Sequence, residues 1–390
     1  MLTQDPSSQL QIEQGPQLIR AVQTGNGELL QQLLDAKADA NHQEVNGLSA
    51  LHWACSDGRV ECVRLLIDSK ADVNLHGEYG ATGLRFAAQN GQLECLKLMI
   101  DAKADVNHQN KHGVSGLYSA CGDGRVECVR LLIDSNADVN LETTDGDTGL
   151  MLAAEKGRPD CLKLMIGAKA DANHQNKYDL SGIHLACRDG YAGRAECVCL
   201  LIDSNADVHL KSYTGNTGLV LAVQHGHLDC VRVILDALTS VNAPGDGTHT
   251  ILSDALKAAV LISRNDEFTV ALLLAGATVG DDWQMSTRAR NRLAAAKQHV
   301  ENTLRYANQF HYIANGVLSE HVEVDTRVGL GGNGLYHEPL ERLLEYLGLC
   351  MTQDQTYRPG NGDESINHAM SGGARNAADW FVRLNAQRHL

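Results

Sequence analysis

The sequence predicts an all-α fold, a solenoid of about eight helix–turn–helix units with hairpin loops followed by a small, mainly helical C-terminal region. The first observation is a period of 33 residues, which brings Gly47, Gly80 and Gly113 into register. The second is that each period holds two short apolar stripes at helical spacing. The third is a single step of 36 residues before Gly215, caused by three extra residues at 191–193. Stacked neighbours must bury faces that one such unit cannot bury alone.

The unit that starts at Gly47 shows how each repeat is built. Ser49 stands at the N-cap of a first helix, and Gly58 follows the last residue of that helix. A second apolar stripe from Val60 to Ile67 predicts a second helix. Residues 71–74 then close this helix and lead into a polar hairpin.

The domain boundaries follow from where the period begins and ends. We expect residues 1–16 to be a disordered tail, because they are rich in Gln and Ser. The repeat domain is predicted at 17–280, and its last, degenerate unit has expected helices at 252–263 and 267–274. The predicted units start near 14, 47, 80, 113, 146, 179, 215 and 247.

Residues 281–390 carry no repeat and resemble no family. Ser286 is the expected cap of a long helix from Arg288 to about Ile313, with Leu293, Val300, Leu304 and Ala307 on one stripe. Further on, the sequence predicts a short strand at 322–324, a glycine-rich loop at 329–334, a helix from Pro339 and a last helix within 374–390.

The six regular units resemble the ankyrin repeat, over residues 17 to about 279. The resemblance is carried by versions of the motif T-P-L-H-x-A at residues 49–54, 82–87, 115–120, 148–153, 181–186 and 217–222. It implies units of a turn and two helices, and protein partners bound on a concave face made of hairpin tips and first helices. His52 and His184 match the family's His, which hydrogen-bonds between neighbouring repeats.

The chain departs from the family pattern at two positions. Ala50 and five glycines replace the Pro that begins the first helix, so we expect less rigid helix starts. The family favours Gly before A-D-V-N, where this chain has Lys37, Lys70, Lys103, Asn136, Lys169 and Asn205. If this position is left-handed, each Lys costs about 1 kcal/mol or more.

A longer period of 66 residues lies on top of the first, because units alternate between two sequence types. Much of the helix sequence therefore records duplication. The hairpins differ from copy to copy, and we interpret these differences as more informative about a partner.

Composition narrows the class of protein. The net charge of −15 makes nucleic acid an unfavourable partner, and the longest apolar runs are too short to span a membrane. The N-terminus lacks the pattern of a signal peptide. Ten of the 11 cysteines lie inside the repeats, where nine recur in phase, and they lack a CxxC pair, which favours buried structural thiols over a metal ladder or disulfides. We expect a cytoplasmic or nuclear, monomeric protein.

No pattern predicts a catalytic residue, a cofactor or a metal site. Residues 329–334 fit G-x-G-x-x-G, but the βαβ unit that a dinucleotide site needs is missing. His337-Glu338 lacks the second His of a zincin helix. His42, His108 and His174 recur in Asn-His-Gln at hairpin bases, where we expect solvated or backbone-bonded rings instead of metal ligands.

The candidate site is therefore a surface. Aromatic and Arg side chains are the usual anchors of an interface. Trp53 has the alternative of packing between helices. The candidate partner-binding residues are Trp53, Asp57, Tyr79, Arg85, Gln89, Tyr118, Asp123, Glu155, Arg188, Tyr213 and His225.

Three functional hypotheses remain open. The favoured one is a protein-binding scaffold or adaptor without catalysis, which uses the concave face. The first alternative is a substrate adaptor whose C-terminal region docks to a larger assembly such as a ubiquitin ligase, because residues 339–350 loosely resemble the leucine-rich helix of such adaptors. The second is a small ligand-binding or enzymatic domain within residues 281–390.

Overall fold

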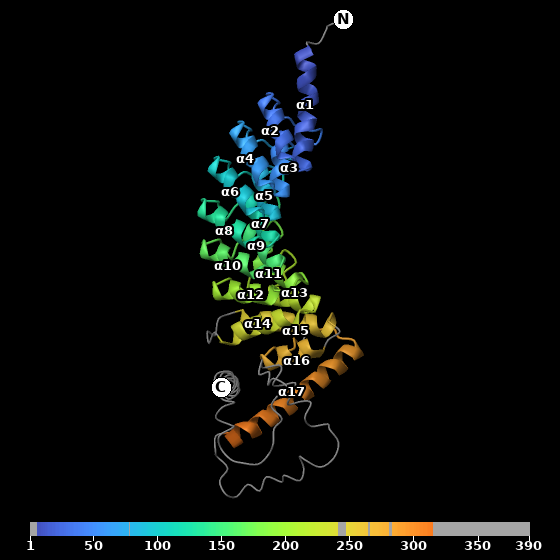
Figure 1. Ribbon diagram of the computed structural model, residues 1–390. Helices are drawn as coiled ribbons and strands as arrows, with labels where there is room; N and C mark the ends of the chain where they lie inside the picture. The colour runs from blue at the N-terminus through green and yellow to red at the C-terminus, as the bar shows by residue number, and fades with distance from the viewer. Residues whose placement is uncertain (1–5, 78, 241–246, 264–265, 281–282, 315–390) are drawn as a thin grey trace, which may run out of the picture. The chain divides into compact units, whose positions relative to one another are not determined.

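The computed structural model describes residues 6–77, 79–240, 247–263, 266–280 and 283–314, and within these every regular element is a helix. The helices of the repeats form two rows, with first helices in one and second helices in the other (Figure 1). The first helices are α1 (Pro6–Gln23), α3 (Ala50–Asp57), α5 (Gly83–Asn90), α7 (Gly116–Gly122), α9 (Gly149–Glu155), α11 (Gly182–Arg188) and α13 (Gly218–His225). The second helices are α2 (Gly27–Asp35), α4 (Val60–Asp68), α6 (Leu93–Asp101), α8 (Val126–Asp134), α10 (Pro159–Gly167), α12 (Arg194–Asp203) and α14 (Leu228–Ser240).

The chain divides into two units, Met1–Ile234 and Leu235–Leu390. The second contains α15 (Thr248–Leu261), α16 (Asp266–Leu274) and α17 (Thr287–Ala314). Val270 and Leu274 of α16 pack with Ala296 and Val300 of α17. Because the division falls inside α14, it differs from the expected boundary at 280, which stays a prediction.

Several predicted elements of this second unit are present. The amide of Ala289 donates to the Ser286 hydroxyl, as expected of a cap for α17 (3.2 Å). Leu293 and Val300 are buried on its predicted stripe. The side chains of Leu304 and Ala307, and all elements predicted after residue 314, lie outside the described residues.

The N-terminal segment differs from the expectation of a disordered tail over 1–16. Helix α1 begins at Pro6, so residues 6–16 are helical. Proline suits the first turn of a helix, and the Gln, Leu and Glu residues that follow are good helix formers. The Gln-rich composition was therefore a poor guide to disorder here.

Each of the six regular units begins its first helix with a Ser or Thr cap and buries the inner side of its second helix. The hydroxyl of Ser115 accepts from the amide of Tyr118 (3.1 Å), and Gly58 after α3 has φ 70°. Cys62 and Leu66 of α4 are buried, and their counterparts recur along the stack. The core is thus a column of apolar side chains between the two rows.

The glycines that begin the first helices are closely packed. The sequence analysis predicts less rigid helix starts there and does not predict this close packing. A Cβ atom added at Gly116 would lie 2.8 Å from Cδ2 of Leu84, and one at Gly218 would lie 2.5 Å from Cγ2 of Ile183. Both neighbours belong to the preceding first helix. Glycine here allows adjacent first helices to approach, so its role is packing as well as freedom.

The residue before each A-D-V-N segment is left-handed. This is the condition under which the sequence analysis predicts a cost in stability for each Lys. Lys70 and Lys103 both have φ 67°, and Asn136 has φ 63°. Lys37, Lys169 and Asn205 adopt the same conformation. A side chain at positive φ is strained, so each Lys lowers the stability of its unit.

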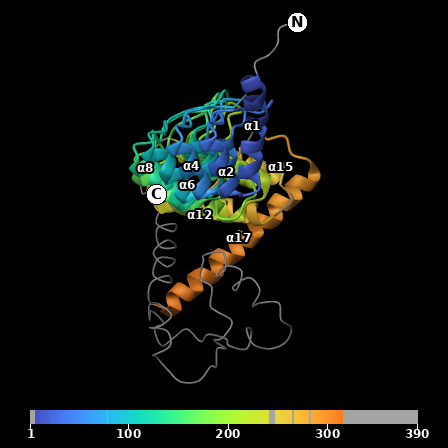
Figure 2. The same ribbon diagram turned by 45° about the horizontal axis from the view of Figure 1, so that its top comes forward.

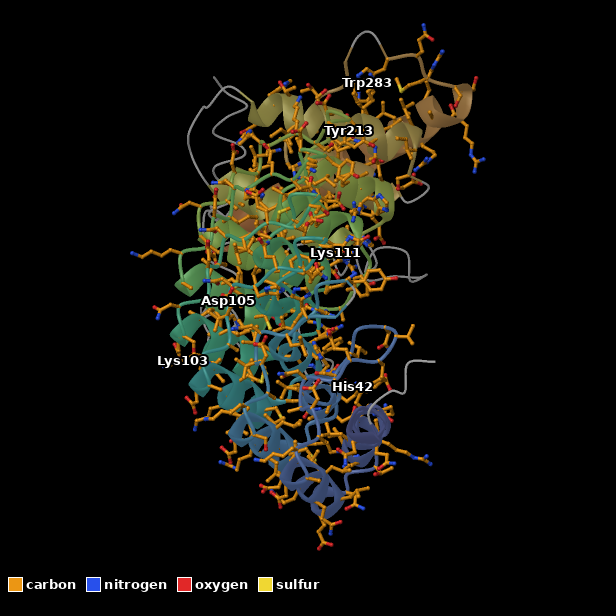
Figure 3. All side chains as sticks on the ribbon, turned by 90° about the horizontal axis from the view of Figure 1, so that it is seen from above. His42, Lys103, Asp105, Lys111, Tyr213 and Trp283 are labelled. Carbon is orange, nitrogen blue, oxygen red and sulfur yellow. The ribbon has the colours of Figure 1, made fainter. Side chains whose placement is uncertain are left out.

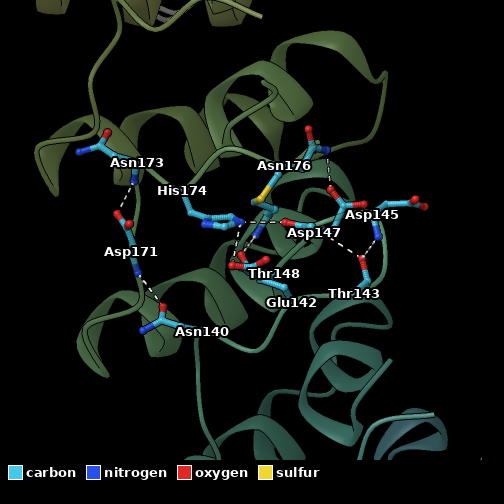
Figure 4. Close-up of polar contacts among 12 residues, drawn as sticks. Asn140, Glu142, Thr143, Asp145, Asp147, Thr148, Asp171, Asn173, His174 and Asn176 are labelled. Atoms are coloured by element: carbon cyan, nitrogen blue, oxygen red, sulfur yellow. Dashed lines mark hydrogen bonds and ion pairs between the residues drawn. The ribbon is translucent and has the colours of Figure 1, made fainter. Parts of the chain in front are cut away.

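The hairpin side of the stack is tied by a ladder of Asn and Asp residues (Figure 4). The side-chain oxygen of Asn140 accepts from the amide of Asp171 in the next unit (3.0 Å), and the Asp171 carboxylate accepts from the amide of Asn173 (2.8 Å). The same inter-unit bond starts at Asn41, Asn74, Asn107 and Asn173. We call this series the hairpin ladder.

Alternate hairpins carry a second tie, which explains part of the 66-residue period. The side-chain amide of Gln109 donates both to the carbonyl of Gly113 (2.7 Å) and to that of Glu142 in the next hairpin (2.8 Å). His108 Nε2 lies 2.9 Å from the carbonyl of Gly80 in the preceding hairpin. Gln43, Gln175 and His174 make the equivalent contacts. The Gln and His residues of alternate hairpins therefore serve stacking, and the other differences among the hairpins stay predicted partner contacts.

The opposite, turn side of the stack is tied in four units by the residue before the second helix. The Nε of Arg125 donates to the carbonyl of Gln89 (3.1 Å), and that of Arg158 donates to the carbonyl of Gly122 (3.4 Å). Gln92 and His227 hold the equivalent place, facing the carbonyls of Ser56 and Arg188. We call this series the turn ladder.

The cysteines behave as structural thiols throughout the described part of the chain. Ten are free, and all of them except Cys199 are buried. Burial raises the pKa of Cys95 and of Cys161 to about 11, so these thiols are protonated at neutral pH. Cys350 lies outside the described residues.

Candidate functional site

The candidate residues belong to the first helices and the hairpins, which together form what we call the helix–hairpin face. The hairpins leave the stack along one edge, above the rows of helices (Figure 2). Lys111 and Tyr213 are labelled on hairpins in Figure 3, whereas Lys103 lies at the margin formed by the second helices. Tyr79, Tyr213, Asp57, Asp123 and His225 are exposed, and Trp53, Arg85, Gln89, Tyr118, Glu155 and Arg188 are half-buried.

Arg85 and Gln89, one turn apart on α5, are directly bonded. Nη1 of Arg85 donates to Oε1 of Gln89 (2.9 Å), and the guanidinium lies 4.8 Å from the ring centroid of Phe86. Burial lowers the pKa of Arg85, because the charged form loses hydration. Its Nε is buried without an acceptor among the described residues.

Trp53 lies one unit earlier, at the position equivalent to Phe86. Its ring is half-buried on α3. One part of the side chain is therefore packed within the protein, and the other part is open to a partner. Nε1 of Trp53 is also buried without an acceptor in the described part of the chain. Buried donors are nearly always paired, and each unpaired one costs about 1–3 kcal/mol. Two adjacent first helices therefore each carry a buried donor without an acceptor among the described residues.

Tyr118 of α7 is held in an acidic environment. Burial raises the pKa of its hydroxyl, and the negative charges of Asp147, Glu155 and Asp145 raise it further. The phenol therefore remains protonated and is a hydrogen-bond donor at all physiological pH values. Glu155 is itself bonded to Lys156 (2.9 Å), so this part of the face carries both charge signs.

Tyr213 lies beside a second tyrosine that the candidate set omitted. The amide of Tyr213 donates to the carbonyl of Tyr178 in the preceding hairpin (3.2 Å), and the ring centroids are 6.3 Å apart. The two side chains are 70% and 50% exposed, which is unusual for neighbouring aromatic rings. They form an apolar patch at the hairpin tips.

Arg188 and His225 lie at the ends of α11 and α13. Arg188 Nη2 pairs with Asp189 (3.1 Å), and the carbonyl of Arg188 lies 3.4 Å from Nε2 of His227. His225 stacks on His227 with centroids 6.2 Å apart. The structure thus brings Arg188 and His225 into one region through His227.

The remaining candidates are not brought into a common cluster. Asp57 and Asp123 are exposed at the ends of α3 and α7, in different units. Tyr79 is 64% exposed, and its carbonyl accepts from the amide of Lys111 (3.1 Å). Their side chains project separately, so any shared role requires a partner that spans several units.

Sequence reasoning missed four residues of this face. Phe86 stands 33 residues after Trp53, and Tyr178 stands 99 residues after Tyr79, so the period itself places them on the face. Tyr191 lies in the three-residue insertion, which the period also reveals. Lys156 is recognised only from its position 4.9 Å from the Tyr191 ring.

The histidines of the hairpin bases and first helices have structural contacts. His108 and His174 bond to backbone carbonyls, as expected for two of the three Asn-His-Gln copies. Nδ1 of His52 accepts from the amide of Ser49 (3.0 Å), and Nε2 faces the carbonyl of Ala81 in the next unit (3.1 Å). His184 makes the same contacts with Ser181 and Asn216. Burial lowers the pKa of both rings.

Within the described ranges, no group of three or more His, Cys, Asp or Glu side chains is placed to hold a metal ion. No helix there combines the length and apolar character needed to cross a membrane. The residues considered for nucleotide binding (329–334), for a zinc site (337–338) and for ligase docking (339–350) lie outside that part of the chain.

Comparison with known proteins agrees with the repeat geometry. A family model that describes three consecutive ankyrin repeats matches four overlapping stretches of the chain. These are residues 18–110, 84–176, 150–245 and 183–282. No curated protein gives a significant match to the chain. Ankyrin repeats generally mediate protein–protein interactions and are typically non-enzymatic. The matched stretches together span well over half of the sequence, and the chain belongs to the ankyrin repeat family.

Proposed function

We propose that this protein is a non-catalytic scaffold or adaptor that binds a partner protein on the helix–hairpin face. The observation that carries the proposal is the contrast between two surfaces. The second helices expose a cation at one repeat position in four successive units, at Arg64, Lys97, Arg130 and Lys163. The first helices and hairpins vary more from unit to unit, as at one exposed hairpin position that holds Tyr79, His112 and Asp145 in successive units. A surface that repeats offers no unique position for a partner, whereas a varied one does.

The chemistry of the face also favours a protein partner. Trp53, Tyr118 and Arg85 are residue types that dominate interface energetics. The exposed rings of Tyr178 and Tyr213 offer apolar area at the hairpin tips.

The test compares two triple variants of the full chain. Trp53→Ala, Tyr79→Ala and Tyr118→Ala together remove the aromatic side chains of the face, and Arg64→Ala, Lys97→Ala and Arg130→Ala are the matched control on the second helices. Each protein captures partners from a cell extract after cross-linking, and the captured proteins are identified by mass spectrometry. We expect the first triple variant to lose partners that the control retains.

Folding is checked by circular dichroism, because Trp53 and Tyr118 are half-buried. The single variant Tyr79→Ala, at an exposed tip, reports on binding without a change in the core. Recovery of every partner with the folded triple variant contradicts the proposal.

A further inference from the structure

The insertion Tyr191-Ala192-Gly193 replaces a tight turn with a projecting one. In the unit that starts at Gly47, the first helix ends at Gly58, which is left-handed. At the end of α11 the equivalent stretch is extended, with Asp189 at φ −94° and ψ 150°. The left-handed conformation moves instead to Gly193, at φ 85°, immediately before α12. The three residues thus rebuild the turn.

The insertion also interrupts the turn ladder. Arg194 holds the place of Arg125 and Arg158, whose Nε atoms each reach a carbonyl of the preceding unit. Arg194 instead donates from Nη1 to the carbonyl of Tyr191 in its own loop (3.1 Å), and its Nε is buried without an acceptor among the described residues. The inserted turn therefore lacks the bond to the preceding unit that Arg125 and Arg158 make, and it leaves one donor without an acceptor in the described part of the chain.

The loop is nevertheless held against its neighbours. The carbonyl of Ala192 packs on Cα of Gly157, in the turn of the preceding unit, where any side chain at Gly157 would collide with it. Nζ of Lys156 lies 4.9 Å from the centroid of the Tyr191 ring and 2.9 Å from Oε1 of Glu155. Tyr191 remains 48% exposed, so its ring is fixed on one side and open on the other.

The next unit completes a patch around the ring. Nε2 of His227 lies 3.4 Å from the carbonyl of Arg188, and His225 stacks on His227. Gly190 borders the His227 ring, because an added Cβ atom there would lie 3.8 Å from Cε1. We define the insertion patch as Glu155, Lys156, Arg188, Tyr191, His225 and His227.

The charge of the patch contrasts with that of the chain. Lys156, Arg188 and the adjoining Arg194 are permanent cations, against two carboxylates, Glu155 and Asp189, in a protein of net charge −15. The imidazoles of His225 and His227 can also donate hydrogen bonds. An exposed aromatic ring beside cations suits a segment that carries carboxylates.

We propose that the insertion patch is the specificity-determining contact for an acidic segment of the partner protein, with Tyr191 as its aromatic anchor. This inference rests on the proposed function, because Glu155, Arg188 and His225 belong to the same helix–hairpin face. It adds the chemistry of the partner segment and the residues that select it.

The experiment uses the full chain and a display library of random twelve-residue peptides. Deletion of residues 191–193 gives a matched control, because the joined sequence Asp189-Gly190-Arg194 copies Asp123-Gly124-Arg125 of a regular unit. We expect the selected peptides to be rich in Asp and Glu. Their dissociation constants, measured by fluorescence anisotropy, are expected to rise about tenfold on deletion and about fivefold with Tyr191→Ala or Lys156→Gln. Added salt weakens binding to the wild type more than to the deletion variant.

Three outcomes overturn the inference: selection of neutral or basic peptides, binding to the deletion variant within about twofold of wild type, or selection of no peptide. Loss of peptide binding with Trp53→Ala, Tyr79→Ala and Tyr118→Ala, but not with the deletion, leaves the proposed function intact and removes the inference alone. Peptides that bind all variants equally contradict both.

Discussion

The hairpin edge and the turn edge of this array are tied with different regularity. At the hairpin edge, an Asn side chain joins each described unit to the next from Asn41 to Asp207. At the turn edge, the bonds made by Arg125 and Arg158 have no counterpart at Arg194, where the insertion intervenes. The comparison teaches that one edge can carry the register of the stack while the other is free to vary. A residue that departs from the period at the turn edge or on a first helix is therefore the most informative about partner binding, because stacking does not require it there.

The largest expected effect comes from breaking the hairpin edge. Gly113 has φ 73°, and a Cβ atom there would lie 2.7 Å from Cα of Thr143 in the next hairpin. Gly113→Val is expected to lower the free energy of unfolding by about 3–5 kcal/mol, because strain at positive φ adds to a collision with backbone. Urea unfolding followed by circular dichroism measures the change. Gly215→Val is the control, since Gly215 has φ 78° but nothing within 4 Å, and an equal loss in both variants would show that the close approach of hairpins is unimportant.

Removal of backbone strain between each second helix and the hairpin that follows it is expected to have the next largest effect. Replacing Lys37, Lys70, Lys103 and Lys169 by Gly removes the strain of positive φ at four positions. The net gain is about 0.5–1 kcal/mol per site after the entropy of glycine is subtracted, or roughly 2–4 kcal/mol together. The urea midpoint should rise accordingly. Replacing Asn136 and Asn205 by Gly should raise it less per site, and a fall in the midpoint of the Lys variant contradicts the strain argument.

Repair of the turn edge is expected to give a smaller gain. Deletion of residues 191–193 should allow Arg194 to reach the carbonyl of Glu155, the equivalent of the acceptors Gln89 and Gly122. One restored hydrogen bond stabilises the fold by about 1 kcal/mol. Thermal unfolding compares the deletion with a variant in which residues 191–193 become Gly-Ser-Gly. If the deletion is the less stable of the two, the turn ladder does not contribute as described.

The smallest effect at neutral pH involves the histidines that join hairpins to first helices. Burial lowers the pKa of His52 and His184 from the ordinary 6.5, so the unfolded chain binds protons more readily than the folded chain. Stability is therefore complete above pH 6.5 and is lost as the pH falls below it. The double variant His52→Gln, His184→Gln should show a shallower loss of unfolding free energy between pH 7.5 and 5.5. Parallel curves for both proteins would contradict this assignment, whereas a residual slope agrees with the lowered pKa of His227.

Much of the fold could be predicted because the period repeats local signals. Ser49, Gly58 and the left-handed Lys residues act within one turn of chain, so sequence alone identifies them. The contacts of Gly116 with Leu84 and of Gly218 with Ile183 join different units, and only the structure shows how closely these helices approach. The helix that begins at Pro6 was missed because polar composition resembles that of disordered chains.

The candidate site was predicted less completely, for a related reason. The period placed Trp53 and Tyr118 on the correct helices. Pairs such as Tyr178 with Tyr213 depend on the register between neighbouring hairpins, and the contact of Lys156 with Tyr191 depends on the path of an irregular turn. The repeat period predicts on which face of the stack a residue lies, but it does not predict which residues of the neighbouring units it contacts.

The alternation of hairpins sets how this array can change in length. Hairpins with Gln43, Gln109 and Gln175 reach into the following hairpin, and the hairpins between them only accept these bonds. Gain or loss of 66 residues by unequal recombination keeps a donor hairpin next to an acceptor hairpin at each new junction. A change of 33 residues joins two hairpins of the same kind and interrupts the alternation at that junction. The alternation of hairpins is therefore kept when the array grows or shrinks by a pair of repeats.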